Sequence, residues 1–483
     1  MTRRADETYC AQHILLVKDS VNGRKRVPCP LDKGHSVWAD QLKHHMEKCR
    51  AKPKDSEDVW YNEDMNITDK EYKEKGNKNV TKGPVDVTKW IPILTELYER
   101  EVKQHPVTRD IRQNDGLKLR LQELENKKHA IQQSSLIGHM ADSGLLYDDE
   151  SGADTLIIEF GCGRAELSRY IYRSQLLNHL QRIENKTSET SKKPKLPKSK
   201  FLLVDRSKPR MKLDCKLTEE YETFKQIHST VSDIEKVLEP EYARLKIDIK
   251  DLDLDKSPFI AQSSNTEKLK VTAVSKHLCG CATDLTLACL KNSHLTQQDN
   301  PARLHGVVIA LCCRQLCSYE TYPLAGRDWL IANEIGAEGF RAITRLTSWA
   351  VCGTREKKPK ADGKNNQEDQ NTEQAIEIKE NGIAAEGNQA LESKNDTNRV
   401  EATVDTEETT STEYTDSKED TNGLTTLRMT EEERERIGLM ARRVIDYGRV
   451  KSLQQLGYKA QVVEYVDKSI SLENHCLVVT GIQ

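Results

Sequence analysis

Short apolar runs with helical stretches between them constrain the fold of this chain more than any other feature. The first run, residues 155–160, is followed by a glycine-rich turn and then by residues with helical periodicity. Similar runs recur at 201–204, 245–249, 271–275, 307–311, 460–465 and 476–480, and most are separated by helical patterns such as 284–290, 328–335 and 431–456. Apolar runs that alternate with helices are typical of a mostly parallel sheet covered on both faces. The sequence therefore predicts an α/β fold with a seven-stranded, doubly wound, Rossmann-like domain.

Composition indicates that two long stretches do not contribute to a core. Apolar residues make up 36% of the chain and charged residues 31%, which is polar for a globular protein. Residues 51–84 are rich in Lys, Asp, Glu and Asn and are predicted to form a linker, and residues 355–425 contain Tyr414 as their only aromatic residue. We therefore expect 355–425 to be a disordered insertion in the α/β domain, which spans 150–354 and 426–483.

Residues 85–147 have helical periodicity. Trp90, Ile93, Leu94 and Leu97, for example, fall at helical spacing. The pattern predicts a helical segment, arranged as a hairpin or short coiled coil, that packs on the α/β domain.

Charge and cysteine content narrow the class of protein. The net charge of −3 does not by itself indicate a nucleic-acid partner. The sequence shows no apolar signal segment and no stretch near the roughly 18 apolar residues of a membrane span, so we expect a soluble intracellular protein, in the nucleus or the cytoplasm. In a reducing compartment the 13 Cys residues are expected to be metal ligands or buried small side chains rather than disulfides.

A cluster of Cys and His near the N-terminus predicts a zinc site over residues 28–50. Cys29, His35, His45 and Cys49 offer two thiolates and two imidazoles, a set that suits tetrahedral zinc. His45 and Cys49 lie four residues apart in a predicted helix, 40–48, and therefore share one helical face. This arrangement resembles the CHHC finger of an RNA-binding spliceosomal protein and of certain tRNA methylases.

Residues 1–27 contain a second pair of potential ligands, Cys10 and His13. The pair looks like the second half of a CCCH-type finger. The two further Cys that such a finger needs are not found before it, so this pair is not expected to complete a second zinc site.

The turn after the first apolar run predicts a cofactor site. Gly161 and Gly163 permit a tight turn and a close approach of the backbone to a ligand. Glu166 stands where a dinucleotide-binding loop would need a third glycine, which argues against a dehydrogenase. S-adenosylmethionine carries a cationic sulfonium, which Glu159 would suit, and Asp205 at the end of the second strand can accept hydrogen bonds from ribose hydroxyls. A basic loop at 184–200 accounts for the long spacing between Gly163 and Asp205.

Asp248, at the third predicted strand, is a further candidate for cofactor binding. It could contact the adenine amino group, or it could be an ordinary surface residue of the acidic run 248–255.

Residues after the fourth and fifth strands are expected near the reacting group. Ligands bind beyond the carboxyl ends of the strands in doubly wound sheets, which places Lys276, His277 and Asp284 beside the methyl group. Four Cys residues lie in the same part of the sequence, namely Cys312, Cys313, Cys317 and Cys352. They could form a second metal site, but we favour buried small side chains because adjacent Cys residues do not easily point at one metal.

These motifs together resemble the tRNA methylase-thirteen family. The resemblance rests on the CHHC finger, Glu159-Phe-Gly-x-Gly, Lys276-His-Leu-Cys-Gly280, Ala310-Leu-Cys-Cys313, Ser348-Trp-Ala350 and Ser471-Leu-Glu-Asn474. It implies a class I methyltransferase domain that 2'-O-methylates nucleotide 4 in the acceptor stem of tRNA, with S-adenosylmethionine and zinc as cofactors. The finger and basic stretches such as 192–200 would contact backbone phosphates.

The resemblance suggests a mechanism and leaves alternatives open. The ribose hydroxyl would attack the sulfonium methyl in line, with His277 as the first candidate for the general base and Lys276 as the second. Cytosine C5 methylation ranks lower because the adjacent Cys residues lack the flanking Pro usual for that chemistry. The alternative functions are a splicing-type RNA-binding protein with an inert methylase domain, and a methyltransferase for rRNA or protein.

Overall fold

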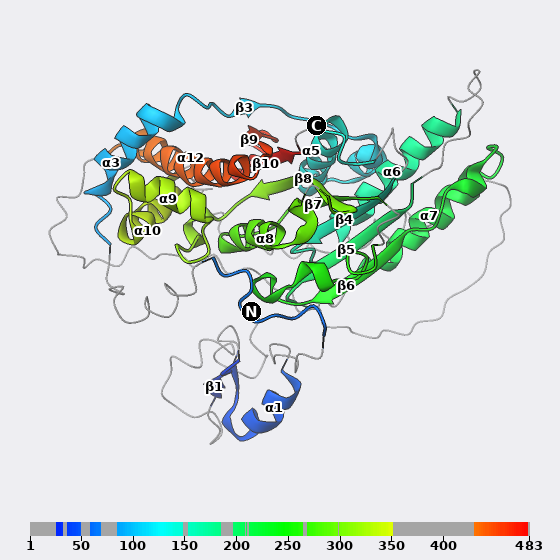
Figure 1. The fold of residues 1–483 in the computed structure, drawn as a ribbon, viewed down its shortest axis with the longest axis horizontal. Helices are drawn as coiled ribbons and strands as arrows, with labels where there is room; N and C mark the ends of the chain where they lie inside the picture. The colour runs from blue at the N-terminus through cyan, green and yellow to red at the C-terminus, as the bar shows by residue number, and fades with distance from the viewer. Residues whose placement is uncertain are drawn as a thin grey trace, which may run out of the picture. The chain divides into compact units, whose positions relative to one another are not determined.

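The computed structural model divides the chain into two compact units (Figure 1), which are described separately. The residues that the structure describes are 26–31, 36–49, 58–68, 85–147, 153–184, 197–207, 209, 212–263, 268–297, 299–350 and 429–481. Several predicted features lie outside these residues, namely Cys10, His13, His35, Cys352 and the expected insertion 355–425.

The smaller unit is a strand pair followed by a helix. Strands β1 (Arg26–Pro28) and β2 (Ser36–Trp38) pair antiparallel, and a 3-10 turn (Ala39–Gln41) leads into helix α1 (Leu42–Lys48). The predicted helix at 40–48 is therefore present, with a 3-10 first turn. The guanidinium of Arg26 lies 4.7 Å from the Trp38 ring and ties the two strands together across their pairing.

The larger unit is built on an eight-stranded mixed sheet. Its strands are β3 (Thr108–Arg109), β4 (Asp154–Phe160), β5 (Ser199–Asp205), β6 (Glu241–Lys246), β7 (Leu269–Ser275), β8 (Ala302–Leu311), β9 (Lys459–Glu464) and β10 (His475–Thr480). Their order is β3-β9-β10-β8-β7-β4-β5-β6, and β10 is antiparallel to both of its neighbours while the other pairs are parallel. All seven predicted strands are present. The prediction was one strand short because β3 has only two residues, too few for a hydrophobic pattern.

Helices connect the strands. They are α3 (Trp90–Leu97), α4 (Lys118–Glu123), α5 (Lys128–Asp142), α6 (Glu166–Glu184), α7 (Cys215–Ile227), α8 (Cys281–Asn292), α9 (Leu324–Ala332), α10 (Ala337–Leu346) and α12 (Glu431–Gln455). Short 3-10 turns include Asp115–Leu117, Ile249–Asp251, Arg314–Leu316 and Thr347–Ala350. Within the described residues, every helix is too short or too polar to cross a lipid bilayer.

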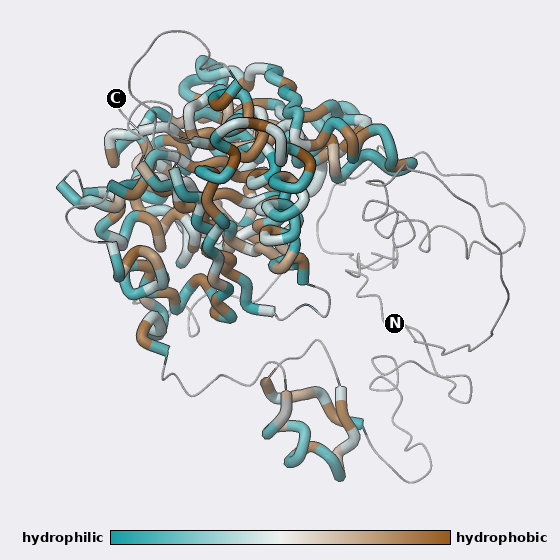
Figure 2. Tube along the Cα trace, turned by 90° about the vertical axis from the view of Figure 1, so that its right-hand side faces the viewer, coloured by the Kyte–Doolittle hydropathy of each residue, from teal (hydrophilic) through white to brown (hydrophobic). Residues whose placement is uncertain are grey.

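Alternation of side chains along the central strands creates two cores. Ile157 and Phe201 face one side of the sheet and pack with α5, α6 and α7, whereas Ile158 and Leu202 face the other side and pack with α8 and the end of α12. In Figure 2, hydrophobic and hydrophilic segments alternate along the trace of this unit. Burial on both faces explains why these strands are continuous apolar runs.

The helices of the segment 85–147 contact different parts of the larger unit, and α4 and α5 also contact each other. Helix α3 packs against α10 and α12, where Leu94 and Leu97 join a separate core with Phe340. Helix α5 instead packs against β8 and α6. The segment thus packs on the α/β domain as predicted, but its helices contact different parts of it.

Residues 58–68, expected to belong to a linker, pack against the loop that follows β6. The Asn66 side chain donates to the carbonyls of Ile249 and Leu252 at 2.7 and 2.8 Å, and Tyr61 pairs with Leu252. Asn66 is fully buried. Its amide satisfies two loop carbonyls, which a composition argument does not detect.

Candidate functional site

The glycine turn between β4 and α6 lies directly against the loop that follows β7. Gly161 and Gly163 have φ angles of 62° and 47°, a conformation that glycine adopts without strain. A Cβ on Gly161 would lie 2.7 Å from the carbonyl oxygen of His277, whereas a Cβ on Gly163 would meet no atom of the described residues within 4 Å. The fold therefore joins two predicted motifs, the glycine turn and the Lys276-His277 pair, at the carboxyl ends of adjacent strands.

Two neighbouring strands support the glycine turn. The Gly163 amide donates to Asp205 Oδ2 at 2.7 Å from the end of β5. The Gly163 carbonyl accepts a 2.9 Å bond from Arg244 of β6, whose guanidinium also forms two bonds to the Asp214 carboxylate. Sequence analysis missed Arg244, since a single Arg within a strand carries no local signal of this contact.

Glu159, near the end of β4, supports the glycine turn. Its carboxylate is buried and accepts bonds from the Ser168 amide at 3.1 Å and the Ser168 hydroxyl at 2.5 Å. Burial raises the pKa of Glu159 to about 7, although the Ser168 bonds and the charge of Arg244 oppose the rise. These contacts direct the carboxylate toward the start of α6.

The two predicted aspartates both follow strand ends. Asp205 Oδ1 accepts from the amide and hydroxyl of Ser207, both at 2.7 Å, in addition to the bond from Gly163. Asp248 follows the end of β6 and accepts from the Lys250 amide at 3.1 Å, where it begins a 3-10 turn. Strand β6 ends at Lys246, earlier than predicted, which puts Asp248 in the loop at the carboxyl edge of the sheet.

Lys276 and His277 lie beside a third basic side chain that the sequence did not indicate. His129 comes from α5, with its Nδ1 atom 2.5 Å from Lys276 Nζ and its ring 6.2 Å from the His277 ring. The His277 imidazole keeps exposed surface, yet the protein surrounds it closely enough to desolvate it. Desolvation, followed by the charges of Lys276 and His129, lowers the pKa of His277 to about 4.

Asp284 occupies a different environment from its two predicted partners. It is fully buried in α8, where its carboxylate accepts two bonds, at 2.8 and 3.0 Å, from Arg449 of α12. The chain of buried ion pairs continues from Arg449 to Asp446 and from Asp446 to Arg314. Burial opposes ionisation of Asp446, but the charge and hydrogen bonds of Arg314, together with the charge of Arg449, outweigh it and lower the pKa of Asp446. Asp284 thus joins α8 to α12 in this structure.

The C-terminal motif holds the turn that follows β8. Glu473 accepts from the Cys313 amide at 3.2 Å and from Arg314 at 2.6 Å, and it pairs with Arg442 at 2.9 Å. Because Arg314 also contacts Asp446 of α12, this turn is anchored both to α12 and to the loop that precedes β10.

The Cys residues of this region divide into two environments. Cys279, Cys312 and Cys313 place their sulfur atoms within 4.8 Å of one another, with Cys279 exposed and the other two partly exposed. Cys317 instead contacts Arg449 at 3.1 Å, inside the buried ion-pair chain. In the described residues, Cys279 rather than Cys317 therefore lies with Cys312 and Cys313, and Cys352, the fourth residue of the alternative metal site, lies outside those residues.

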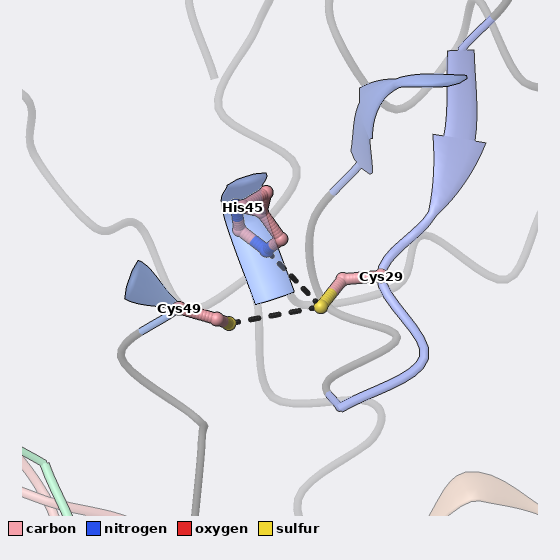
Figure 3. A group of neighbouring side chains, drawn as sticks. All are labelled: Cys29, His45 and Cys49. Carbon is pink, nitrogen blue, oxygen red and sulfur yellow. Dashed lines mark hydrogen bonds between the residues drawn. The ribbon is translucent and has the colours of Figure 1, made fainter. Parts of the chain in front are cut away.

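The smaller unit brings three predicted zinc ligands together. Figure 3 shows Cys29 just after β1, His45 on α1 and Cys49 just after α1, with their side chains directed toward one point. The Cys29 and Cys49 sulfur atoms are 3.6 Å apart, and His45 Nε2 is 3.2 Å from the Cys29 sulfur. These are the donor types and spacings that suit a tetrahedral zinc ion.

A cavity lies elsewhere on the larger unit. It is lined by Asp154, Lys200 and Glu241, which stand at or near the amino ends of β4, β5 and β6. It is therefore at the opposite edge of the sheet from the glycine turn, where parallel α/β sheets rarely bind ligands.

Comparison with known families matches both units. A family model described as "Methyltransferase TRM13" matches residues 131–480, and one described as "U11-48K-like CHHC zinc finger" matches residues 26–50. The chain is similar to a protein of Yarrowia lipolytica named "tRNA:m(4)X modification enzyme TRM13", with 38% identity over 99% of this chain and 86% of the relative. Proteins of the same name from Saccharomyces cerevisiae and Schizosaccharomyces pombe are 31% and 34% identical, over 99% and 69% of this chain and 92% and 77% of each relative.

Proposed function

Because this chain belongs to the TRM13 methyltransferase family, we propose that it methylates the ribose 2'-hydroxyl of nucleotide 4 in the acceptor stem of tRNA. The observation that carries the proposal is the contact between the glycine turn and the His277 backbone, which brings cofactor-type and proton-accepting groups to one edge of the sheet. The strand order, with antiparallel β10 between β8 and β9, is consistent with a class I methyltransferase fold.

The residues at the glycine turn fit S-adenosylmethionine. The open space at Gly163 and the positive φ angles allow a ligand to approach the backbone, and Asp205 and Asp248 offer acceptors at the next two strand ends. Asp205 would accept from ribose hydroxyls and Asp248 from the adenine amino group. Glu159 would act on the cationic sulfonium from behind the turn, with negative charge once its raised pKa is passed, and its Oε2 atom would stay engaged by Ser168.

Lys276 and His277 would act on the ribose. S-adenosylmethionine, when bound, supplies an electrophilic methyl group. His277 would accept the proton that the 2'-hydroxyl loses, because its backbone lies against the glycine turn and the residue keeps exposed surface. Lys276, held beside His129, would orient the neighbouring phosphate. Asp284 is left out of the reacting groups in this proposal, since its carboxylate is engaged by Arg449.

The finger would hold zinc and contribute to RNA binding. We assign its ligands as Cys29, His35, His45 and Cys49, of which three converge in the described residues. Two thiolates and two neutral imidazoles complete a closed structural site, which stabilises a unit too small to fold on an apolar core. A-form RNA is recognised through its shape, phosphates and 2'-hydroxyls, and a rigid finger can supply such contacts.

Analysis of the methylated nucleoside tests the function. Purified protein is incubated with unmodified tRNA and isotopically labelled S-adenosylmethionine, and the nucleosides and RNase fragments are analysed by mass spectrometry. We expect one labelled 2'-O-methylnucleotide at position 4. The matched control is Gly161→Ala, whose Cβ would collide with the His277 carbonyl and deform the turn.

Three outcomes would contradict the proposal. Label on a base would exclude the ribose as the acceptor. Label on rRNA or protein instead of tRNA would support the alternative substrates. An absence of S-adenosylmethionine binding by calorimetry would support an RNA-binding protein with an inert methylase domain.

A further inference from the structure

Three Cys side chains converge at the ends of β7 and β8, outside the groups assigned to catalysis. Cys279 lies in the loop after β7, and Cys312 and Cys313 follow β8. Their sulfur atoms all lie within 4.8 Å of one another, and those of Cys279 and Cys312 are 3.5 Å apart. None of the three thiols is fully buried, so Cys312 and Cys313 are not the buried small side chains that the sequence favoured.

The backbone conformation explains how two adjacent Cys residues can serve one cluster. Cys313 has a φ angle of 48° and a ψ angle of 45°, in the left-handed region. In extended backbone the side chains of neighbouring residues point to opposite sides, whereas this conformation lets the side chains of Cys312 and Cys313 lie on the same side. The strain of that conformation is offset by the bond from its amide to Glu473. On the other side, the Gly280 amide donates to the Cys312 carbonyl at 3.4 Å. The loops are thus held by contacts that do not involve the thiols.

The spacing of this cluster matches that of the finger in the same chain. The sulfur separation is 3.5 Å for Cys279 and Cys312 and 3.6 Å for Cys29 and Cys49. Zinc bound at about 2.3 Å to two thiolates in tetrahedral geometry separates them by about 3.8 Å. A disulfide would require about 2 Å. Both clusters are therefore close to the geometry of metal-bound thiolates.

We propose that Cys279, Cys312 and Cys313 bind a second metal ion, a thiophilic divalent cation such as Zn²⁺, separate from the zinc of the finger. Three thiolates suit soft or borderline cations. Among the described residues, the 4.8 Å group consists of these three Cys residues. The ion ties the loop of Lys276 and His277 to the turn after β8, two segments that otherwise meet through backbone contacts such as the Gly280 bond.

Metal analysis of the full-length protein tests this site independently of methyl transfer. The protein is purified under reducing conditions with Zn²⁺ present, and its zinc content is measured by mass spectrometry. We expect two zinc ions per chain in the wild type. The Cys29→Ser/Cys49→Ser and Cys279→Ser/Cys312→Ser variants should each lose one. Cys215→Ser is the matched control, because Cys215 is exposed on α7 and belongs to neither cluster, and it should retain both ions.

Cobalt spectroscopy keeps the test decisive if the Cys279→Ser/Cys312→Ser variant fails to fold. The Cys29→Ser/Cys49→Ser protein leaves the catalytic unit intact, and after Co²⁺ loading it should show thiolate-to-cobalt charge-transfer absorption. The proposal would be overturned if the wild type binds one zinc ion and the Cys279→Ser/Cys312→Ser variant retains that ion. A Cys279–Cys312 disulfide, detected by peptide mass spectrometry without a second metal, would also overturn it and would identify a redox pair instead.

Discussion

At the residue scale, the proposed proton acceptor can be tested with little disturbance of the fold. The glycine turn lies against the backbone carbonyl of His277, which an alanine keeps, and His277 has exposed surface. His277→Ala should therefore lower turnover by about 100-fold or more while leaving S-adenosylmethionine affinity nearly unchanged. Lys276→Ala is the comparison, and it should mainly raise the apparent affinity constant for tRNA. Loss of cofactor binding together with a lower melting temperature in His277→Ala would identify His277 as a structural residue.

The buried carboxyl of Glu159 should impose a pH dependence on stability. Its folded-state pKa of about 7 exceeds the ordinary value of 4.5, so between these pH values the folded protein keeps a proton that the unfolded chain releases. The free energy of unfolding should therefore fall as pH rises through this window, by up to about 3 kcal/mol. Glu159→Gln should remove this fall, as measured by chemical denaturation from pH 5 to 8. Glu222→Gln, on the exposed side of α7, should keep it. Equal pH dependence in wild type and Glu159→Gln would refute the assignment.

At the scale of elements, removing the ion pair between α8 and α12 tests whether Asp284 has a structural or a catalytic role. Both partners are buried, so Asp284→Ala leaves Arg449 without its bidentate acceptor. We expect a loss of about 3–5 kcal/mol in the free energy of unfolding. Glu338→Ala removes the exposed pair with Lys89 and should cost less than about 1 kcal/mol. If Asp284→Ala abolished turnover and left stability unchanged, Asp284 would be assigned a catalytic role.

At the scale of the whole molecule, removal of residues 358–422 should leave catalysis within a few fold. The composition of 355–425 predicts no core, and the described segments on either side are held by their own contacts. The turn Thr347–Ala350 packs on α12, where a Cβ on Gly438 would lie 2.2 Å from the Ala350 amide nitrogen, and Arg442 donates to the Thr347 carbonyl. Turnover and melting temperature of the deletion variant provide the measurement. An unfolded or inactive product would assign the segment a structural role.

The sequence by itself determined the α/β class, seven of the eight strands and the family. Strands buried on both faces must be continuous apolar runs, and the positive φ angles of Gly161 and Gly163 require the residue type that the motif supplies. The family resemblance drawn from short motifs is confirmed by the two family models. The start of β6 was predicted too late because Glu241 and Arg244 interrupt its apolar pattern, and its end was predicted too late because Ile247 and Ile249 continue that pattern past Lys246.

Only the tertiary structure decided which polar groups meet. Arg244 reaches the Gly163 carbonyl across 81 residues of sequence, and Asp284 meets Arg449 across 165. Cys279 joins Cys312 and Cys313 rather than Cys317 because two loop ends converge at one edge of the sheet and Cys313 adopts a left-handed conformation. Apolar burial follows local periodicity, so it can be inferred from neighbouring residues. Pairing of charges and thiols depends on where distant loops converge, which no local pattern specifies.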